Sequence, residues 1–179
     1  MNIREFVSRI KREAGQCRNE EEFRHKFLNA WQELIGDLGY SDSVRIEERI
    51  TRGKADARFR SLVFEFKNPS VNILSSHRGR ADALRELRDH LNQYVEMGSK
   101  PEELKGIITD GGLVASLSYD QRRRAFVAVD EFERYARDES AYMPFGNAEL
   151  LFDATIFGLT KRELTPQNLI EEFGPASEV

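Results

Sequence analysis

The stretch from Gly53 to Pro69, GKADARFRSLVFEFKNP, predicts two short β-strands joined at Arg60 and Ser61. Both segments are rich in residues that favour strands, and the two residues between them leave room only for a tight turn. We therefore expect the strands to pair as antiparallel neighbours.

Three charged side chains interrupt this hairpin: Asp56, Glu65 and Lys67. Side chains alternate between the two faces of a strand, so Glu65 and Lys67 share one face. Pairing about the turn brings Asp56 close to Glu65. Two acids and one lysine should therefore meet at one end of the hairpin, while the opposite face of the second strand is apolar, with Leu62, Phe64 and Phe66.

The rest of the chain predicts helices and strands in a mixed order, which indicates an α/β domain with helices on the faces of a mixed sheet. A capping-box pattern at Asn19 and Glu22 opens the second helix, which stops near Gly36 to Gly39. A further strand precedes the hairpin, so the three form an antiparallel meander, and a later strand is central. Helices are expected at 3–14, 20–36, 80–97, 130–137, 148–157 and 166–173, and strands at 43–50, 55–59, 62–66, 107–109, 113–119 and 124–132.

Composition bounds the class of protein. The 179 residues are 40% hydrophobic and carry a net charge of -4. This suits one domain with a full core. The single Cys17 excludes an internal disulfide, and three scattered histidines give no Cys/His zinc ligand set. The charged N-terminal stretch has no apolar signal segment and no run is long enough to span a membrane, so we expect a cytoplasmic protein.

The charged hairpin end suits phosphodiester hydrolysis. Asp56 and Glu65 can hold Mg²⁺ through oxygen ligands, and the backbone carbonyl of Phe66 is a further candidate ligand. Lys67 can orient the attacking water or stabilise transition-state charge, and its pKa decides whether it can also act as a base. The alternative is a solvated hairpin face on which Glu65 and Lys67 form a weak surface pair.

The run GKADARFRSLVFEFKN resembles the core of the PD-(D/E)xK nuclease superfamily, with Asp56 as the lone Asp and Glu65-Phe66-Lys67 as the ExK element. The order of helix, meander, long helix and the GIITDG strand is similar to that of the N-terminal nuclease domains of type I and fused type IIG restriction enzymes. The resemblance covers about two-thirds of the chain. It implies a restriction-endonuclease-like fold that cuts double-stranded DNA with Mg²⁺, for which Mn²⁺ can substitute.

The same resemblance divides the chain into a nuclease core at 1–140 and a helical extension at 141–179. The tail LTPQNLIEEFGPAS is similar to the segment that leads toward an adenine methyltransferase domain. It implies that the chain is the cleavage module of a restriction-modification enzyme, with a methyltransferase or specificity domain or subunit as partner.

Two further elements of the resemblance are less regular. Members of this group carry a Gln-x-x-x-Tyr element after ExK, and here His90 stands in the Gln position while Tyr94 matches. The two share a helix face and could reach the site, or Tyr94 is a core residue and His90 lies at its boundary. Glu20, at the tip of the second helix, is either an additional metal ligand or an acid that favourably meets the helix dipole.

Basic residues flank the proposed site. Arg52, Lys54 and Arg58, with Arg45 and Arg49, are expected to neutralise DNA phosphates without reading sequence. The run 122–124 is either an extension of that track or a solvated turn.

Two other functions use the same residues. A nuclease-like fold could serve only to bind nucleic acid or another subunit, because fold does not fix activity. A repair or recombination nuclease would use the same chemistry on ends or junctions.

Overall fold

A computed structural model describes residues 1–40, 45–50, 53–130, 132 and 134–160, with the backbone alone described for 45–50, 53–54 and 159–160. Within these residues the chain forms four α-helices and one mixed sheet, which confirms the predicted mixed α/β class. The helices are α1 (Ile3–Ala14), α2 (Glu20–Asp37), α3 (His77–Glu96) and α4 (Glu149–Thr160). The strands are β1 (Arg45–Ile50), β2 (Gly53–Phe59), β3 (Leu62–Phe66), β4 (Lys105–Thr109), β5 (Leu113–Asp120), β6 (Ala125–Val129) and β7 (Met143–Pro144).

The sheet follows chain order, from β1 to β6, and β7 pairs with β5. The first three strands form the predicted antiparallel meander, in which Ala57 pairs with Phe64 and Phe59 with Leu62. β4 lies beside β3 and runs parallel to it, because α3 crosses over between them. The carboxyl ends of β3 and β4 therefore lie at the same edge of the sheet.

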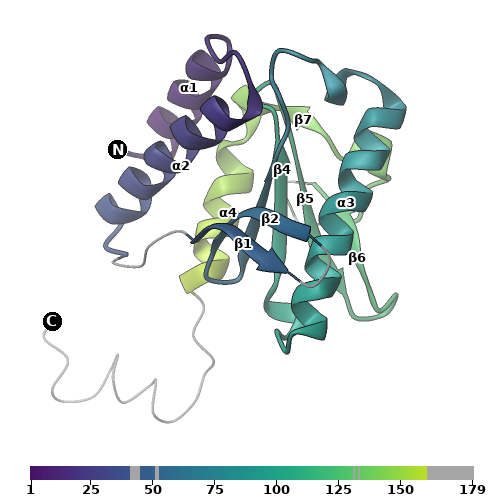
Figure 1. The fold of residues 1–179 in the computed structure, drawn as a ribbon. Coiled ribbons are helices and arrows are strands. Elements are labelled where there is room, and N and C mark those ends of the chain that lie inside the picture. Colours follow the sequence, from purple (N-terminus) through teal and green to yellow (C-terminus); the bar gives the residue numbers. More distant parts are fainter. Residues whose placement is uncertain (41–44, 51–52, 131, 133, 161–179) are drawn as a thin grey trace, which may run out of the picture.

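Helices cover the sheet on both sides (Figure 1): α1, α2 and α4 lie on one face, and α3 lies on the other. The first face buries an aromatic cluster that includes Phe6, Phe27, Trp31, Phe64 and Phe152. β7 pairs with β5 and α4 packs into this same cluster, so both elements share the core formed by earlier residues.

The face under α3 is mainly aliphatic and tightly packed. Leu84, Leu87 and Leu91 bury their side chains against β3, β4 and β5. Gly106 of β4 permits this approach, because a Cβ there would lie 2.9 Å from side-chain atoms of Leu87 and Leu91. The long helix thus sits directly over the strands that carry the charged residues.

The start of α3 differs from the sequence prediction. Ser76 caps the helix by accepting a hydrogen bond from the N–H of Gly79, so the helix begins at His77 and not at Arg80. The sequence predicts Gly79 in a loop, yet this residue belongs to the first turn. A Cβ at Gly79 would lie only 2.0 Å from the carbonyl oxygen of Ile73, so close packing explains this glycine.

The helix predicted at 130–137 is wrong. None of the described residues in this range is helical; Val129 forms a β-bridge with Tyr135. The Asp130 carboxylate accepts hydrogen bonds from the N–H groups of Phe132 and Arg134, which folds the chain back in a turn.

Two other sequence predictions concern the start of α2 and the C-terminal part of the chain. Asn19 caps α2 by accepting from the N–H of Glu22, but the Glu22 side chain accepts from Arg18 and so does not complete a capping box. The helix predicted at 166–173 lies outside the described residues. Within the described part of the chain, the helices are too short or too polar to cross a membrane.

Candidate active site

Strand β3 places Glu65 on the α3 side of the sheet, as its alternation predicts. Leu62, Phe64 and Phe66 join the aromatic cluster, whereas Val63 packs under α3. The Glu65 side chain is only 5% exposed, which excludes the alternative of a solvated hairpin face. A charged group this deep requires partners.

Asp56 lies next to Glu65 across the β2–β3 pair, since their positions continue the register of Ala57 with Phe64. Its Oδ2 accepts a hydrogen bond of 2.7 Å from the N–H of Phe66. Burial, and then the negative charge of Glu65, raise the pKa of Asp56 to about 6. The negative charge of Glu65 therefore disfavours the ionised form of Asp56.

Lys67 completes the predicted group of three. Its ammonium donates to Glu65 Oε1 at 2.9 Å and to Glu86 Oε2 at 2.7 Å. Burial acts to lower the pKa of this lysine, but the two carboxylates outweigh it and hold the pKa above its ordinary value. Lys67 therefore stays protonated near neutral pH, which excludes it as a base in this arrangement.

His90 contacts Glu65 directly, and Tyr94 packs against Arg58. His90 Nδ1 lies 3.1 Å from the second oxygen of Glu65. Burial opposes the charged imidazole, yet the hydrogen bond to Glu65 gives His90 a raised pKa. Tyr94 is fully buried one turn later, where its ring lies 4.4 Å from the guanidinium carbon of Arg58.

Helix α2 brings two residues to the same place. Glu20 is partly buried, and its pKa is raised by burial, with Lys67 opposing this effect and Glu65 adding to it. Arg24, one turn later, is 9% exposed and its NH1 lies 3.5 Å from Asp56 Oδ1. The first turn of α2 therefore faces the two acids.

The sequence interpretation missed Arg24 and Glu86. Both lie four residues from a candidate: Arg24 follows Glu20 on α2, and Glu86 precedes His90 on α3. Residues four apart share a helix face, so this spacing was the available signal. Its use required knowledge of how each helix docks on the sheet.

Among the described residues, no group of three or more His, Cys, Asp or Glu side chains is arranged to hold a metal ion. Glu65 is nevertheless buried and Asp56 is partly buried beside it, so a divalent cation between the two carboxylates could relieve the charge repulsion that raises the pKa of Asp56. The backbone of Phe66 adjoins Asp56 through its N–H, and Glu20 lies near enough to affect, and be affected by, the charges of Glu65 and Lys67.

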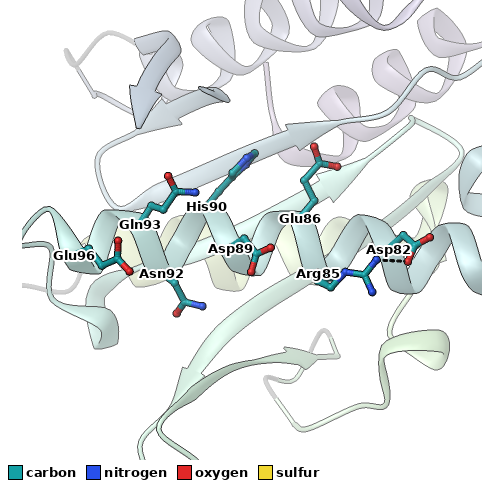
Figure 2. A pocket seen from close by; sticks show the side chains of 8 residues that line it. All are labelled: Asp82, Arg85, Glu86, Asp89, His90, Asn92, Gln93 and Glu96. Atoms are coloured by element: carbon teal, nitrogen blue, oxygen red, sulfur yellow. Dashed lines mark hydrogen bonds and ion pairs between the residues drawn. The ribbon is translucent and has the colours of Figure 1, made fainter. Parts of the chain in front are cut away.

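A groove of about 640 Å³ runs along α3 beside the site. Figure 2 shows Glu86, His90 and Gln93 on the side of the helix turned toward a neighbouring strand. The described lining is acidic and favours cations over phosphate. It consists of Asp82, Arg85, Glu86, Asp89, His90, Asn92, Gln93 and Glu96.

The predicted DNA contacts are only partly described. Arg58 is on β2, on the α3 side, whereas Arg52 and the side chains of Lys54, Arg45 and Arg49 lie outside the described residues. The run 122–124 forms the β5–β6 turn, at the end of the sheet opposite Glu65. There the Asp120 carboxylate accepts two backbone N–H groups of the turn, as expected for a structural turn.

Comparisons of this chain with protein-family models, with curated proteins and with solved structures gave no match.

Proposed function

We propose that this protein is a Mg²⁺-dependent DNA endonuclease domain with a restriction-endonuclease-like fold. The observation that supports this most is the convergence of Asp56 on β2, Glu65 on β3 and Lys67 just after β3 in one largely buried group. The order of α2, meander, α3 and β4 is the order that the family resemblance implies. The same resemblance makes it the cleavage module of a restriction-modification enzyme, acting with a methyltransferase or specificity partner.

In this proposal Asp56 and Glu65 hold the metal, with the Phe66 carbonyl and Glu20 as further oxygen ligands. The bound Mg²⁺ supplies Lewis-acid polarisation of the phosphate and acidification of a water molecule. Lys67, kept protonated by its two carboxylate partners, stabilises negative charge on the phosphate oxygens.

Two neighbouring side chains assist these groups. The hydrogen bond from His90 orients Glu65, in the way that outer partners fix metal ligands. Arg24 supplies a second buried positive charge at Asp56. It compensates the carboxylate when no cation is bound.

The test is nicking of a supercoiled plasmid with purified wild-type protein in Mg²⁺, in Mn²⁺ and in EDTA. Asp56→Asn, Glu65→Gln and Lys67→Ala should each lower the rate by about 10³-fold. Asp89→Asn is the matched control, because Asp89 is an exposed acid of the α3 groove without a contact to Glu65. Nicking that persists in the Asp56 and Glu65 variants, or in EDTA, would reject the proposal.

A second candidate is a catalytically inactive nuclease-like module. The acidic groove along α3 favours it, because four carboxylates beside one arginine suit a basic partner better than a phosphate backbone. Mn²⁺ titration separates the two candidates. The enzyme should bind the ion through Asp56 and Glu65, and the interaction module should not.

A repair or recombination nuclease is a third candidate with the same chemistry. A panel of linear, nicked and branched DNA substrates distinguishes it from an enzyme that cuts intact duplex.

A further inference from the structure

A second hollow, of about 550 Å³, lies at the other end of β3. It is formed by the β2–β3 turn and by the connection from α3 to β4, which are joined where the N–H of Lys105 donates to the carbonyl of Ser61. We call it the turn hollow. Its charged lining residues are Arg58, Arg60, Lys100 and Glu103. Three basic groups against one acid give it the opposite charge from the α3 groove.

Arg58 is held in a fixed orientation at this hollow. Its guanidinium carbon lies 4.4 Å from the centre of the buried Tyr94 ring, a cation–π contact. Its Nε donates to the carbonyl of Arg60 at 2.7 Å, and its NH2 is 3.5 Å from the hydroxyl of Ser99. An arginine fixed in this way loses less side-chain entropy when it binds an anion.

The other two basic residues are exposed. Arg60 occupies the left-handed region, with φ of 54°, at the tip of the turn. Its guanidinium carbon lies 4.8 Å from the Tyr40 ring centre. Lys100 is paired with Glu103 at 3.1 Å. This is a surface contact that a phosphate could replace at little cost.

The turn hollow is linked to the proposed site by two elements. Asp56 and Arg58 are two residues apart on β2 and share a face, and His90 and Tyr94 are four apart on α3 and share a face. Asp56 and His90 belong to the charged group around Glu65, whereas Arg58 lines the turn hollow and Tyr94 packs beneath its guanidinium. The four residue steps from Ser61 at the turn hollow to Glu65 span about 13 Å, roughly the axial rise of four phosphates along one strand of B-DNA.

We propose that the turn hollow binds backbone phosphate of double-stranded DNA and so positions the strand that is cut. This inference rests on the proposed function, because the duplex is then the substrate. It also gives each residue of the His90 and Tyr94 pair a role in binding or cutting the same DNA strand. His90 orients an acid of the site, and Tyr94 supports the arginine that holds the strand.

The experiment measures anisotropy of a fluorescent 20-base-pair duplex with the full chain in EDTA, where no metal-dependent cleavage interferes. The variant Arg60→Ala with Lys100→Ala removes two exposed charges of the turn hollow. The control Arg4→Ala with Arg12→Ala removes the same charge from α1. The hollow variant should bind about tenfold more weakly, and its plot of log affinity against log salt should be shallower by about 2, since each phosphate contact contributes about 0.9.

Equal weakening in the two double variants, or no change in either, would overturn the inference. Arg58→Lys provides a second measurement that keeps the charge and removes the planar group stacked on Tyr94. It should weaken binding while thermal unfolding stays near that of wild type. A wild-type protein without metal-dependent nicking but with hollow-dependent binding would reject the nuclease proposal and support the turn hollow. Normal nicking and normal DNA binding by the Arg60→Ala, Lys100→Ala variant would support the nuclease proposal and reject the turn hollow as a phosphate site.

Discussion

The two faces of the sheet differ in what they bury. The face under α1, α2 and α4 buries aromatic rings in edge and stacked contacts, with Phe27 at the centre. The face under α3 buries mainly aliphatic side chains and, at the carboxyl end of β3, the charged group of Glu65, Lys67 and His90. Burial of apolar area stabilises the fold, whereas burial of charge opposes it. Apolar burial on the aromatic face therefore offsets the free-energy cost of burying charged groups on the α3 face.

The largest effect is expected on the aromatic face. Phe27→Ala should lower the free energy of unfolding by about 4 kcal/mol. The reason is that this ring is fully buried and contacts rings from α1, α2 and β3. Chemical denaturation followed by circular dichroism measures the loss. Phe157→Ala is the control, since that residue is 65% exposed. It should change stability by less than about 0.5 kcal/mol. Similar losses in both variants would contradict the central position of Phe27.

The charged face should respond in the opposite direction. The pKa of Asp56 is about 6 in the folded protein against an ordinary value of 3.8, so its protonated form favours folding. That contribution is complete below about pH 3.8 and is lost as pH rises through 6. At pH 8, Asp56→Asn should therefore raise the free energy of unfolding by on the order of 2 kcal/mol.

Denaturant titrations at pH 5 and pH 8 test this difference. The gain from Asp56→Asn should be largest at pH 8 and about half as large at pH 5, because the unfolded carboxylate is already ionised there while the folded one is mostly protonated. Mn²⁺ should stabilise the wild type at pH 8 and leave the variant unchanged, because the ion binds the folded carboxylates. Destabilisation by Asp56→Asn at pH 8 would show that the acid is there for structure alone.

A smaller effect concerns the histidine in the position where the resembled family has Gln. His90→Ala leaves one oxygen of Glu65 without its partner and should lower the nicking rate roughly 10- to 100-fold. His90→Gln can donate to the same oxygen and should stay within about threefold of wild type. Equal losses in the two variants would show that the imidazole itself is required.

The sequence predicted the charged face better than the elements that complete it. Alternation along 62–66 fixes which face Glu65 takes, and a two-residue turn fixes Asp56 opposite it, so local rules suffice there. Arg24 and Glu86 were missed because their positions depend on how two helices dock. The helix at 130–137 was wrong because the chain folds back on itself there: the N–H of Asp130 donates to the carbonyl of Arg134, the reverse of the helical direction, and Val129 forms an antiparallel bridge with Tyr135.

The smallest effect separates two explanations of Glu20. Glu20 and Glu21 both lie in the first turn of α2 and interact alike with the helix dipole. Glu20→Gln and Glu21→Gln should therefore each cost less than about 0.5 kcal/mol of stability. Only Glu20 is partly buried beside Lys67 and Glu65, whereas the Glu21 side chain is 74% exposed. Titration with Mn²⁺ should show roughly tenfold weaker binding for Glu20→Gln and wild-type binding for Glu21→Gln. Equal Mn²⁺ affinities in the two variants would assign Glu20 to the helix dipole and restrict the metal site to the sheet.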